Sequence, residues 1–374
     1  MKVLILSCNT GEGHNSAGKA IAEQFEDNGI YCEMKDALSF ASERVSKIVC
    51  NLYINISLHT PKLFGWVYSA GEAISSPKFR SPVYYANKEY AFALGEYINE
   101  NGFDTIICPH LFPCEALTAL KRKNKLSANI YAVSTDYSCC PFFEEVAVNH
   151  YFIPHDDLTN EFAERGIPYR QLIPTGIPVS KKFLEKTDKH EARNILGLPQ
   201  EPKIVIIMTG SMGFGQIEKM VLQLNQKAPD LGIVVLAGNN EELKQSLRNQ
   251  FNGNSLVSIV DFTKQVSLYM DACDVIFTKP GGLSSTEAAV KNIPIIHTKP
   301  IPGCETQNAV FYEKKGLSII GKDIDTAIES AIEICYNDKK YQAMKKAQQK
   351  EINPYAAEDI FNFVLENAKV NHYG

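Results

Sequence analysis

The opening loop of the chain combines glycines with a histidine at the start of a helical pattern. Gly11-Glu12-Gly13-His14 follows the apolar run 3–7 and precedes a helix expected over 16–28. Glycine lets the backbone approach a ligand closely, and a helix N-terminus presents free N–H groups. We place His14 in the loop after the first strand, where open α/β folds bind ligands. His14 could act as a general base, since histidine titrates near neutral pH, or it could serve only as a helix cap or a satisfied polar group.

Two common nucleotide-binding patterns fit this loop incompletely. The dinucleotide pattern GxGxxG would need a glycine where Ser16 stands. The P-loop pattern comes nearer, because Gly13 and Gly18-Lys19 match it. However, Ala20 stands where a Ser or Thr hydroxyl should bind magnesium. The loop therefore favours neither a dehydrogenase nor a nucleoside triphosphatase.

A second glycine loop, 209–215, follows the apolar run 204–208. Its backbone N–H groups, with Gly210 and Ser211 at their centre, could hold a diphosphate at a helix N-terminus without a metal ion. A plain strand-to-helix turn is the alternative interpretation.

A third glycine loop is the run 279–287, which follows an expected strand over 275–278. Gly281 and Gly282 begin it, and we place Glu287 in the first turn of the next helix. A carboxylate there could accept hydrogen bonds from two ribose hydroxyls, or it could act as a capping-box residue. The polar run 300–308 follows at another strand–helix junction and suits either sugar hydroxyls or a capped turn.

Metal-binding patterns are weak in this sequence. Asp323-Ile324-Asp325 resembles the DxD of metal-dependent glycosyltransferases, but it follows no nucleotide loop and more simply starts a surface helix. The sequence contains no HExxH, no CxxC and no GxSxG pattern. We therefore expect no metal and no cofactor.

Strands and helices alternate in both halves of the chain. Besides those at 3–7 and 204–208, we expect strands over Thr105–Cys108, Tyr131–Ser134, His150–Ile153, Ile233–Leu236, Leu256–Val260, Val275–Thr278 and Pro294–His297. This alternation predicts right-handed crossovers, parallel sheets and two Rossmann-like α/β domains. The proline-rich stretch 173–178 marks the boundary, giving domains 1–177 and 178–354. The last helix, 355–369, could pack back on the first domain.

The segment Ala41–Leu94 departs from this alternation. It is rich in aromatic residues, contains Trp66, the one tryptophan of the chain, and carries Arg80 among six basic residues against three acidic ones. Aromatic and basic residues together suit an anionic membrane interface, whereas a helical hairpin packed on the sheet is the plainer alternative.

The composition of the chain limits the classes of protein to which it can belong. The 374 residues are 45% apolar and 22% charged, with a net charge of −5, which is ordinary for a globular protein and indicates no nucleic-acid partner. Ten scattered cysteines and an N-terminus that leads straight into a strand favour reduced thiols and a cytoplasmic location. No stretch approaches the roughly 20 apolar residues of a membrane span.

Taken together, these motifs resemble the monogalactosyldiacylglycerol synthase / processive diacylglycerol glucosyltransferase family, which is related to MurG. The resemblance implies the GT-B fold, in which two Rossmann-like domains face a central cleft. It extends over essentially the whole chain and rests on Gly11-Glu12-Gly13-His14 with Ser16-Ala17, Thr135-Asp136, Gly176-Ile177-Pro178, the run 279–288 and the run 302–308. The chain departs from the family in having Cys304 where glutamine is frequent.

The resemblance implies inverting, metal-independent transfer of a hexose from a UDP-sugar to a membrane diacylglycerol. His14 resembles the general base. The donor-binding residues implied are Gly210 and Ser211 at the diphosphate, Phe262 and Thr263 at the uracil, Gly281 and Gly282 at the phosphates, Glu287 at the ribose, and Glu305 and Asn308 at the sugar. The first domain would bind the acceptor and an anionic membrane surface through the segment that holds Trp66 and Arg80, with Asp136 nearby.

The protein would accordingly lie peripherally on the inner face of the cell membrane. Three alternatives remain open at this point. They are transfer of N-acetylglucosamine from its UDP donor to a polyprenyl lipid, a UDP-sugar 2-epimerase, and a noncatalytic protein that binds nucleotide sugars.

Overall fold

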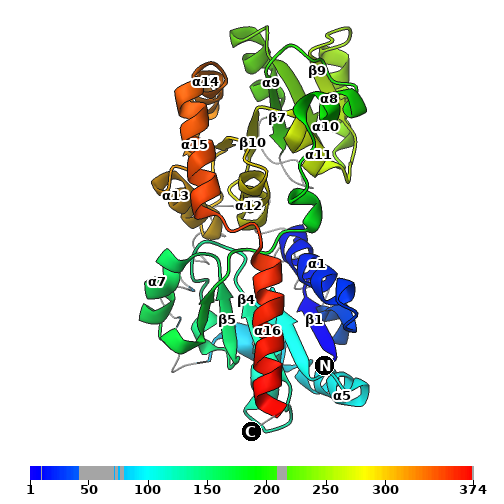
Figure 1. The fold of residues 1–374 in the computed structure, drawn as a ribbon, viewed down its shortest axis with the longest axis vertical. Coiled ribbons are helices and arrows are strands. Elements are labelled where there is room, and N and C mark those ends of the chain that lie inside the picture. The colour runs from blue at the N-terminus through cyan, green and yellow to red at the C-terminus, as the bar shows by residue number, and fades with distance from the viewer. Residues whose placement is uncertain (10, 42–70, 72–74, 76–79, 209–216, 373–374) are drawn as a thin grey trace. The chain divides into compact units, whose positions relative to one another are not determined.

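The chain divides into two compact units in the computed structural model, which describes residues 1–9, 11–41, 71, 75, 80–208 and 217–372 (Figure 1). The first unit comprises Met1–Lys181, Ile301–Gln307 and Asn353–Gly374, and the second comprises Lys182–Pro300 and Asn308–Ile352. Among the predicted site residues, Trp66, Gly210 and Ser211 lie outside the described residues.

A six-stranded parallel sheet forms the centre of the first unit. Its strand order is β2-β1-β3-β4-β5-β6, and each neighbouring pair is parallel. The strands are β1 (Val3–Ser7), β2 (Cys32–Asp36), β3 (Thr105–Cys108), β4 (Asn129–Val133), β5 (His150–Ile153) and β6 (Leu172–Pro174).

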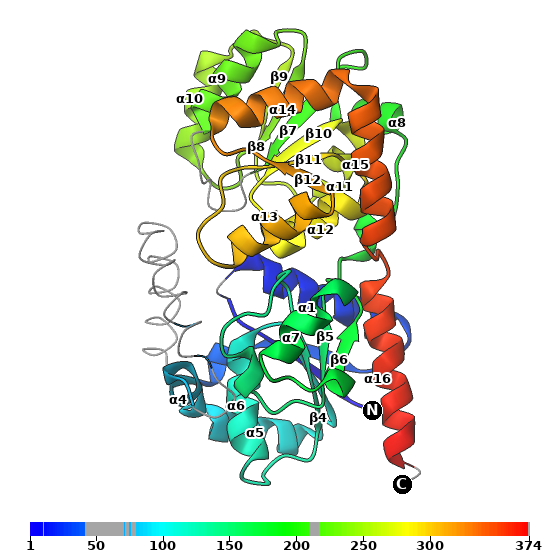
Figure 2. The same ribbon diagram turned by 90° about the vertical axis from the view of Figure 1, so that its left-hand side faces the viewer.

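Helices cover both faces of this sheet. The α-helices are α1 (Glu12–Asp27), α4 (Pro82–Lys88), α5 (Ala91–Asn101), α6 (Leu111–Lys121), α7 (Thr159–Glu164) and α16 (Ala356–His372), joined by short 3₁₀ helices at Ala37–Phe40, Phe143–Glu145, Asp156–Leu158 and Tyr169–Gln171. Phe25 of α1 and Phe361 of α16 meet edge to face, 5.0 Å between ring centroids, in a core shared with β1, β3, β4 and β5. Figure 2 shows α16 on one side of the sheet and α5 and α6 on the other. The C-terminal helix is therefore part of the first unit.

The second unit repeats this architecture with strand order β12-β11-β10-β7-β8-β9, again all parallel. Its strands are β7 (Ile204–Met208), β8 (Gly232–Leu236), β9 (Val257–Val260), β10 (Val275–Thr278), β11 (Ile295–His297) and β12 (Ser318–Ile320). Its helices are a 3₁₀ turn at Lys181–Phe183, α8 (Lys189–Leu196), α9 (Ile217–Lys227), α10 (Glu241–Gln250), α11 (Val266–Ala272), α12 (Gly282–Val290), α13 (Cys304–Lys314), α14 (Ile324–Tyr336) and α15 (Asp338–Glu351). The first turn of α13 clusters with the first unit.

Each sheet has one point where the strand order reverses direction. In the first sheet it lies between β1 and β3, and in the second between β7 and β10. Ligands of open parallel sheets bind outside the carboxyl ends of the strands at such a point. The topology therefore directs attention to the loops after β1 and β3 and to the loops after β7 and β10.

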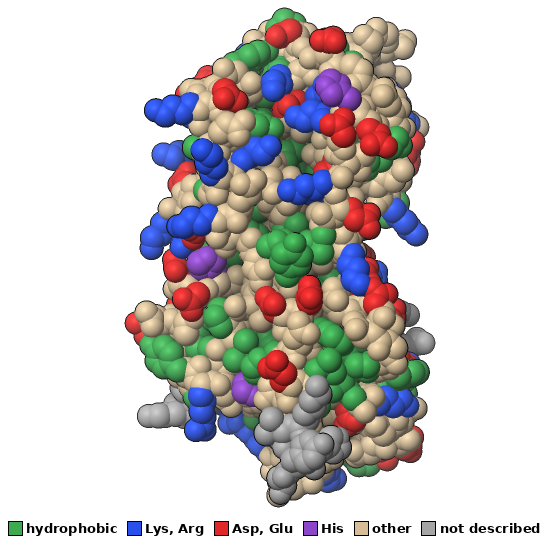
Figure 3. All heavy atoms as spheres, viewed as in Figure 1, with side chains coloured by type: hydrophobic (Ala, Val, Ile, Leu, Met, Phe, Trp, Pro, Cys, Tyr) green, Lys and Arg blue, Asp and Glu red, His purple; other side chains and the backbone are tan. Residues whose placement is uncertain are grey.

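The prediction of two parallel α/β domains is confirmed. Asp323 caps α14 through a capping box with Thr326, as expected of a residue that starts a surface helix. Three strands escaped the prediction, namely β2, β6 and β12. Within the described residues, no helix is both long and apolar enough to cross a bilayer. Acidic and basic side chains are interspersed over the face shown in Figure 3.

Candidate active site

His14 lies at the switch point of the first sheet, in the first turn of α1. The sequence prediction placed it in a loop, and that is wrong: Gly11 is the N-cap residue, with an extended backbone, so the helix begins at Glu12. The side chain is half-buried and points to the loops after the neighbouring strands. Its Nδ1 lies 2.8 Å from the backbone oxygen of Pro109 and 2.9 Å from Oγ1 of Thr135.

The contact with Pro109 fixes the tautomer of His14. A carbonyl oxygen can only accept a hydrogen bond, so Nδ1 must carry the proton that it donates to Pro109. In the neutral ring the other nitrogen, Nε2, then holds an unprotonated lone pair. This is the form of histidine that can take a proton from a hydroxyl.

Electrostatics keep His14 largely neutral at physiological pH. Burial lowers its pKa below the ordinary histidine value, although the nearby Asp136 carboxylate and the hydrogen bond to Pro109 act in the opposite direction. The position in the first turn of α1 adds to the lowering, because a helix N-terminus disfavours positive charge. A base with a pKa somewhat below the working pH is already deprotonated when substrate arrives.

A second histidine, His110, packs against the first. The two ring centroids are 4.5 Å apart and the rings are nearly perpendicular. Nδ1 of His110 accepts a hydrogen bond from the backbone N–H of Phe112 at the start of α6, so its proton lies on Nε2. Burial, reinforced by His14, lowers the pKa of His110 well below its usual range. His110 is therefore neutral, and its ring packs against the His14 ring and helps to orient it.

Sequence reasoning missed His110, although a signal was present. Pro109-His110 directly follows β3, the strand beside β1 at the switch point, so its side chains had to face the start of α1, which holds His14. Thr135 likewise follows β4. The structure thus brings the start of α1 together with two loops whose contact residues, Pro109 and Thr135, lie 95 and 121 residues further along the chain.

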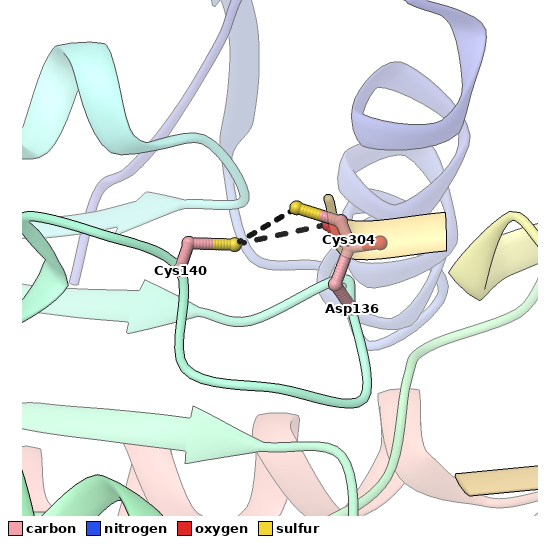
Figure 4. Close-up of side chains that lie close together, drawn as sticks. All are labelled: Asp136, Cys140 and Cys304. Atoms are coloured by element: carbon pink, nitrogen blue, oxygen red, sulfur yellow. Dashed lines mark hydrogen bonds between the residues drawn. The ribbon is translucent and has the colours of Figure 1, made fainter. Parts of the chain in front are cut away.

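The predicted acceptor-side residues Asp136 and Arg80 lie in the first unit. Asp136 is half-buried in the loop after β4, and Figure 4 shows it beside Cys140 and Cys304. Arg80 forms an ion pair with the buried carboxylate of Glu145, 3.7 Å from Nη1 to Oε2, and its guanidinium lies over the ring of Tyr84. Contact of either residue with a lipid stays a prediction.

In the second unit, Gly281 and Gly282 begin α12 directly after β10. Gly281 is the N-cap residue and donates its own N–H to the Lys279 carbonyl oxygen at 2.8 Å, and a Cβ atom at this position would meet no atom within 4 Å, so a ligand could approach the start of the helix closely. Pro280 accepts a hydrogen bond from the buried Asn308 side chain at 3.0 Å, which fixes the glycine loop from behind. A helix N-terminus held in this way is a suitable seat for a diphosphate.

Glu287 lies in the second turn of α12, not in the first as predicted, because the helix begins at Gly282. The capping-box alternative is thereby excluded, since that role requires the third helical position. Burial raises the pKa of its half-buried carboxyl to about 8, although Lys182 acts to lower it. Hydrogen-bond donors favour the ionised form of such a carboxyl, and two ribose hydroxyls could supply these hydrogen bonds.

Of the remaining donor-side residues, Phe262 is exposed, whereas Thr263 and Glu305 accept hydrogen bonds from nearby backbone N–H groups. Phe262 is 59% exposed after β9, and the Thr263 hydroxyl accepts a hydrogen bond from the Gln265 N–H at 3.0 Å. The Glu305 carboxylate accepts a hydrogen bond from the Ile301 N–H at 2.9 Å, which closes the turn before α13. Phe262 is thus available for stacking, whereas Glu305, in the first turn of α13, already accepts a hydrogen bond from the preceding segment.

An open groove of about 530 Å³ lies elsewhere in the first unit, beside α1 and the end of β2. Asn15, Lys19 and Asp36 are among its lining residues, and His14 is not. The groove therefore differs from the site defined by the strand switch point.

Solved structures with the same architecture place the chain in a class. It matches Acinetobacter baumannii MurG with a TM-score of 0.65 at 14% identity, covering 98% of this chain and 99% of that one. It also matches the UDP-GlcNAc 2-epimerase from Neisseria meningitidis bound to UDP-GlcNAc, with a TM-score of 0.64 at 17% identity over 98% and 100% of the two chains. The fold is thus the two-domain GT-B architecture, which transferases and epimerases share.

Sequence comparisons identify the family. Residues 14–179 match the sequence model for monogalactosyldiacylglycerol (MGDG) synthase, and residues 204–360 match the glycosyltransferase family 28 C-terminal domain. Curated relatives named processive diacylglycerol beta-glucosyltransferase include one from Bacillus thuringiensis (strain Al Hakam), 28% identical over 99% of this chain and 95% of its own length. Another, from Bacillus cereus (strain G9842), is 29% identical over 97% and 93%. The chain is therefore a glycosyltransferase that combines an MGDG synthase domain with a glycosyltransferase family 28 C-terminal domain.

Proposed function

We propose that the protein transfers a hexose from a UDP-sugar to the free hydroxyl of a diacylglycerol, inverting the sugar and using no metal ion. The observation that carries this proposal is the His14 tautomer, with Nδ1–H donated to Pro109 and Nε2 left to accept a proton. The acceptor follows the printed names of the full-length relatives. Their beta products support inversion, because UDP-hexoses of the common type carry the sugar in alpha linkage.

In this mechanism His14 Nε2 removes the proton of the acceptor hydroxyl while the acceptor oxygen bonds to C1 of the sugar. The bond from C1 to the UDP oxygen breaks, and UDP leaves with the electron pair. Backbone N–H groups in the first turn of α12, from Gly282 onward, with the positive end of the helix, would stabilise the growing negative charge. Glu287 would accept hydrogen bonds from the ribose and Glu305 would contact the sugar, while the buried Asn308 would support the donor site by holding Pro280.

We further propose that the protein acts as a peripheral enzyme on the inner face of the cell membrane. Among the largely exposed aromatic side chains of the first unit, Tyr85 of α4 (56%) and Phe92 of α5 (60%) each have a lysine beside the ring. The Lys88 ammonium lies 5.9 Å from the Tyr85 ring centroid, and that of Lys125 lies 5.4 Å from the Phe92 ring centroid. Exposed aromatic rings with adjacent lysines suit the interface of an anionic bilayer.

A reconstitution experiment tests the reaction. Purified protein is mixed with a panel of UDP-sugars and with vesicles that contain either diacylglycerol or a polyprenyl phosphate lipid, with EDTA throughout. Mass spectrometry of the lipid extract, and NMR of the product for its anomeric configuration, should show a beta-hexosyl diacylglycerol. A product formed only on the polyprenyl lipid, epimerisation of UDP-N-acetylglucosamine without acceptor, or strict dependence on Mn²⁺ would each refute the proposal.

Flotation with anionic vesicles tests the membrane contact. Replacing both Lys88 and Lys125 with glutamate should weaken vesicle binding by more than an order of magnitude, because each lysine near such a surface contributes about 1 kcal/mol. Tyr169→Ser is the matched control, since Tyr169 is equally exposed, at 61%, but lies in another part of the first unit. Equal flotation of the charge-reversed variant and the control would contradict this contact surface.

A further inference from the structure

Two thiols and a carboxylate converge beside the candidate base. Asp136 and Cys140 come from the loop after β4, and Cys304 begins α13 (Figure 4). All three belong to the first unit, because Ile301–Gln307 clusters with it. Each is half-buried, so the group is reachable from solvent.

The distances within the group match those of a tetrahedral metal centre. The two Sγ atoms of Cys140 and Cys304 are 3.7 Å apart, and Cys140 Sγ is 3.9 Å from Asp136 Oδ2. With Zn–S of about 2.3 Å and Zn–O of about 2.0 Å, ligands at a tetrahedral zinc ion lie about 3.8 Å apart for two sulfurs and about 3.5 Å for sulfur and oxygen. One ligand atom from each residue lies within 4.8 Å of the other two. Small side-chain rotations would therefore complete the arrangement.

We propose that Asp136, Cys140 and Cys304 form a binding site for a thiophilic divalent cation of the Zn²⁺ class. Two sulfur ligands and one carboxylate select Zn²⁺ over Mg²⁺, Ca²⁺ or Mn²⁺, which prefer all-oxygen surroundings. Three protein ligands leave a fourth coordination position for water, as in zinc sites that are not purely structural. Binding releases the thiol protons to solvent, so that both sulfurs bind as thiolates.

The position of the site predicts an effect on the enzyme. Thr135, next to Asp136, contacts the His14 ring, and Cys304 precedes Glu305 in the first turn of α13. An ion held here would restrain both segments and would withdraw the Asp136 charge from His14. We therefore expect Zn²⁺ to inhibit transfer, a consequence that rests on the proposed function, whereas the binding itself does not.

The decisive experiment measures metal binding by the full chain. Reduced protein freed of metal with a chelator is titrated with Co²⁺, whose thiolate complexes absorb strongly in the near ultraviolet, and then with Zn²⁺. We expect a thiolate-to-cobalt band that saturates at one equivalent and that one equivalent of Zn²⁺ abolishes. Cys140→Ser and Cys304→Ser should each lose the band, and Asp136→Asn should bind Zn²⁺ at least about tenfold more weakly.

Cys32→Ser is the matched control, because Cys32 is a half-buried thiol on β2 outside the group, and it should retain the band. Circular dichroism of every variant verifies folding. Absence of the band in the reduced wild type would overturn the proposal, as would its persistence in the Cys140→Ser/Cys304→Ser double variant. Loss of two titratable thiols without any metal would assign the pair to a disulfide instead. A bound ion without inhibition would leave the site intact and would count only against the proposed link to transfer.

Discussion

Replacing His14 with alanine tests the role of the proposed base independently of UDP binding. The side chain is anchored through Nδ1 to Pro109 and Thr135, and its proposed work is done by Nε2. The variant should fold, because the His14 side chain is only half-buried in the first turn of α1 and alanine is a good helix former. It should also bind UDP normally, since the residues assigned to UDP lie in the second unit.

The expected loss follows from what the histidine supplies. A positioned general base typically contributes on the order of 10²–10⁴-fold to the rate, which corresponds to about 2.7–5.4 kcal/mol of transition-state stabilisation. Thr135→Val removes a single hydrogen-bonding hydroxyl beside Nδ1 and leaves the Pro109 carbonyl in place. A net hydrogen bond of about 0.5–1.5 kcal/mol limits that loss to roughly two- to tenfold. The two variants should therefore differ by at least about an order of magnitude.

The assay measures single-turnover transfer to vesicle-borne diacylglycerol, alongside UDP affinity by calorimetry. We expect kcat to fall at least about a hundredfold in His14→Ala with the Kd for UDP unchanged. A His14→Ala enzyme that turns over like the wild type would remove His14 from the chemistry. A loss as large in Thr135→Val would show instead that orientation of the loop, not proton removal, limits the rate.

Three other predictions concern titration and stability. In the wild type, kcat/KM should stay level near neutral pH and decline only below the ordinary histidine pKa of about 6.5. The reason is that the pKa of His14 is lowered and its neutral form is the base. A decline that begins above pH 7 would contradict this. UDP affinity should rise as the pH passes the Glu287 pKa of about 8, because the ionised carboxyl accepts both ribose hydrogen bonds. Glu287→Gln should abolish that rise and weaken binding roughly ten- to hundredfold, as calorimetry across pH would reveal. Asp274, buried and paired with Lys189 and Arg193, should cost about 3–5 kcal/mol of unfolding free energy when replaced by alanine, measured by urea denaturation at pH 7. Burial opposes ionisation of Asp274, but Lys189 and its other partners outweigh it and lower its pKa, so the contribution should be present above about pH 4 and vanish on further acidification.

Periodicity predicted the central strands because their residues are buried on both faces. β1, β7 and β10 are apolar runs without alternation, as parallel strands between two helical layers must be. The edge strand β2 reads Cys-Glu-Met-Lys-Asp and is half-buried throughout, so it lacked that signal. β6 and β12 have three residues each, too few to show any period.

The sequence pointed to His14 as a candidate base but not to the geometry around it, and it missed His110. The start of α1 depends on the extended backbone of Gly11, which no spacing rule reveals, and the prediction therefore placed His14 in a loop. The partner of His14, Thr135, lies 121 residues away. Their proximity follows from the strand order, since the loops after β1, β3 and β4 emerge at one edge of the sheet. Strand order is a tertiary property, so sequence pattern alone could nominate these loops without pairing them.

In both units, burial shifts the pKa of a candidate site residue so that its neutral form is favoured. In the first, burial lowers the pKa of His14, which keeps a base free of protons. In the second, burial raises the pKa of Glu287, which keeps a carboxyl largely neutral until a ligand arrives. A neutral carboxyl near a helix N-terminus does not repel an approaching diphosphate, and hydroxyl donors from the ribose then favour its ionised form. Desolvation therefore suits both groups to the roles proposed for them. His14 stays unprotonated and can act as a base, and Glu287 stays largely neutral and does not repel the diphosphate before UDP binds.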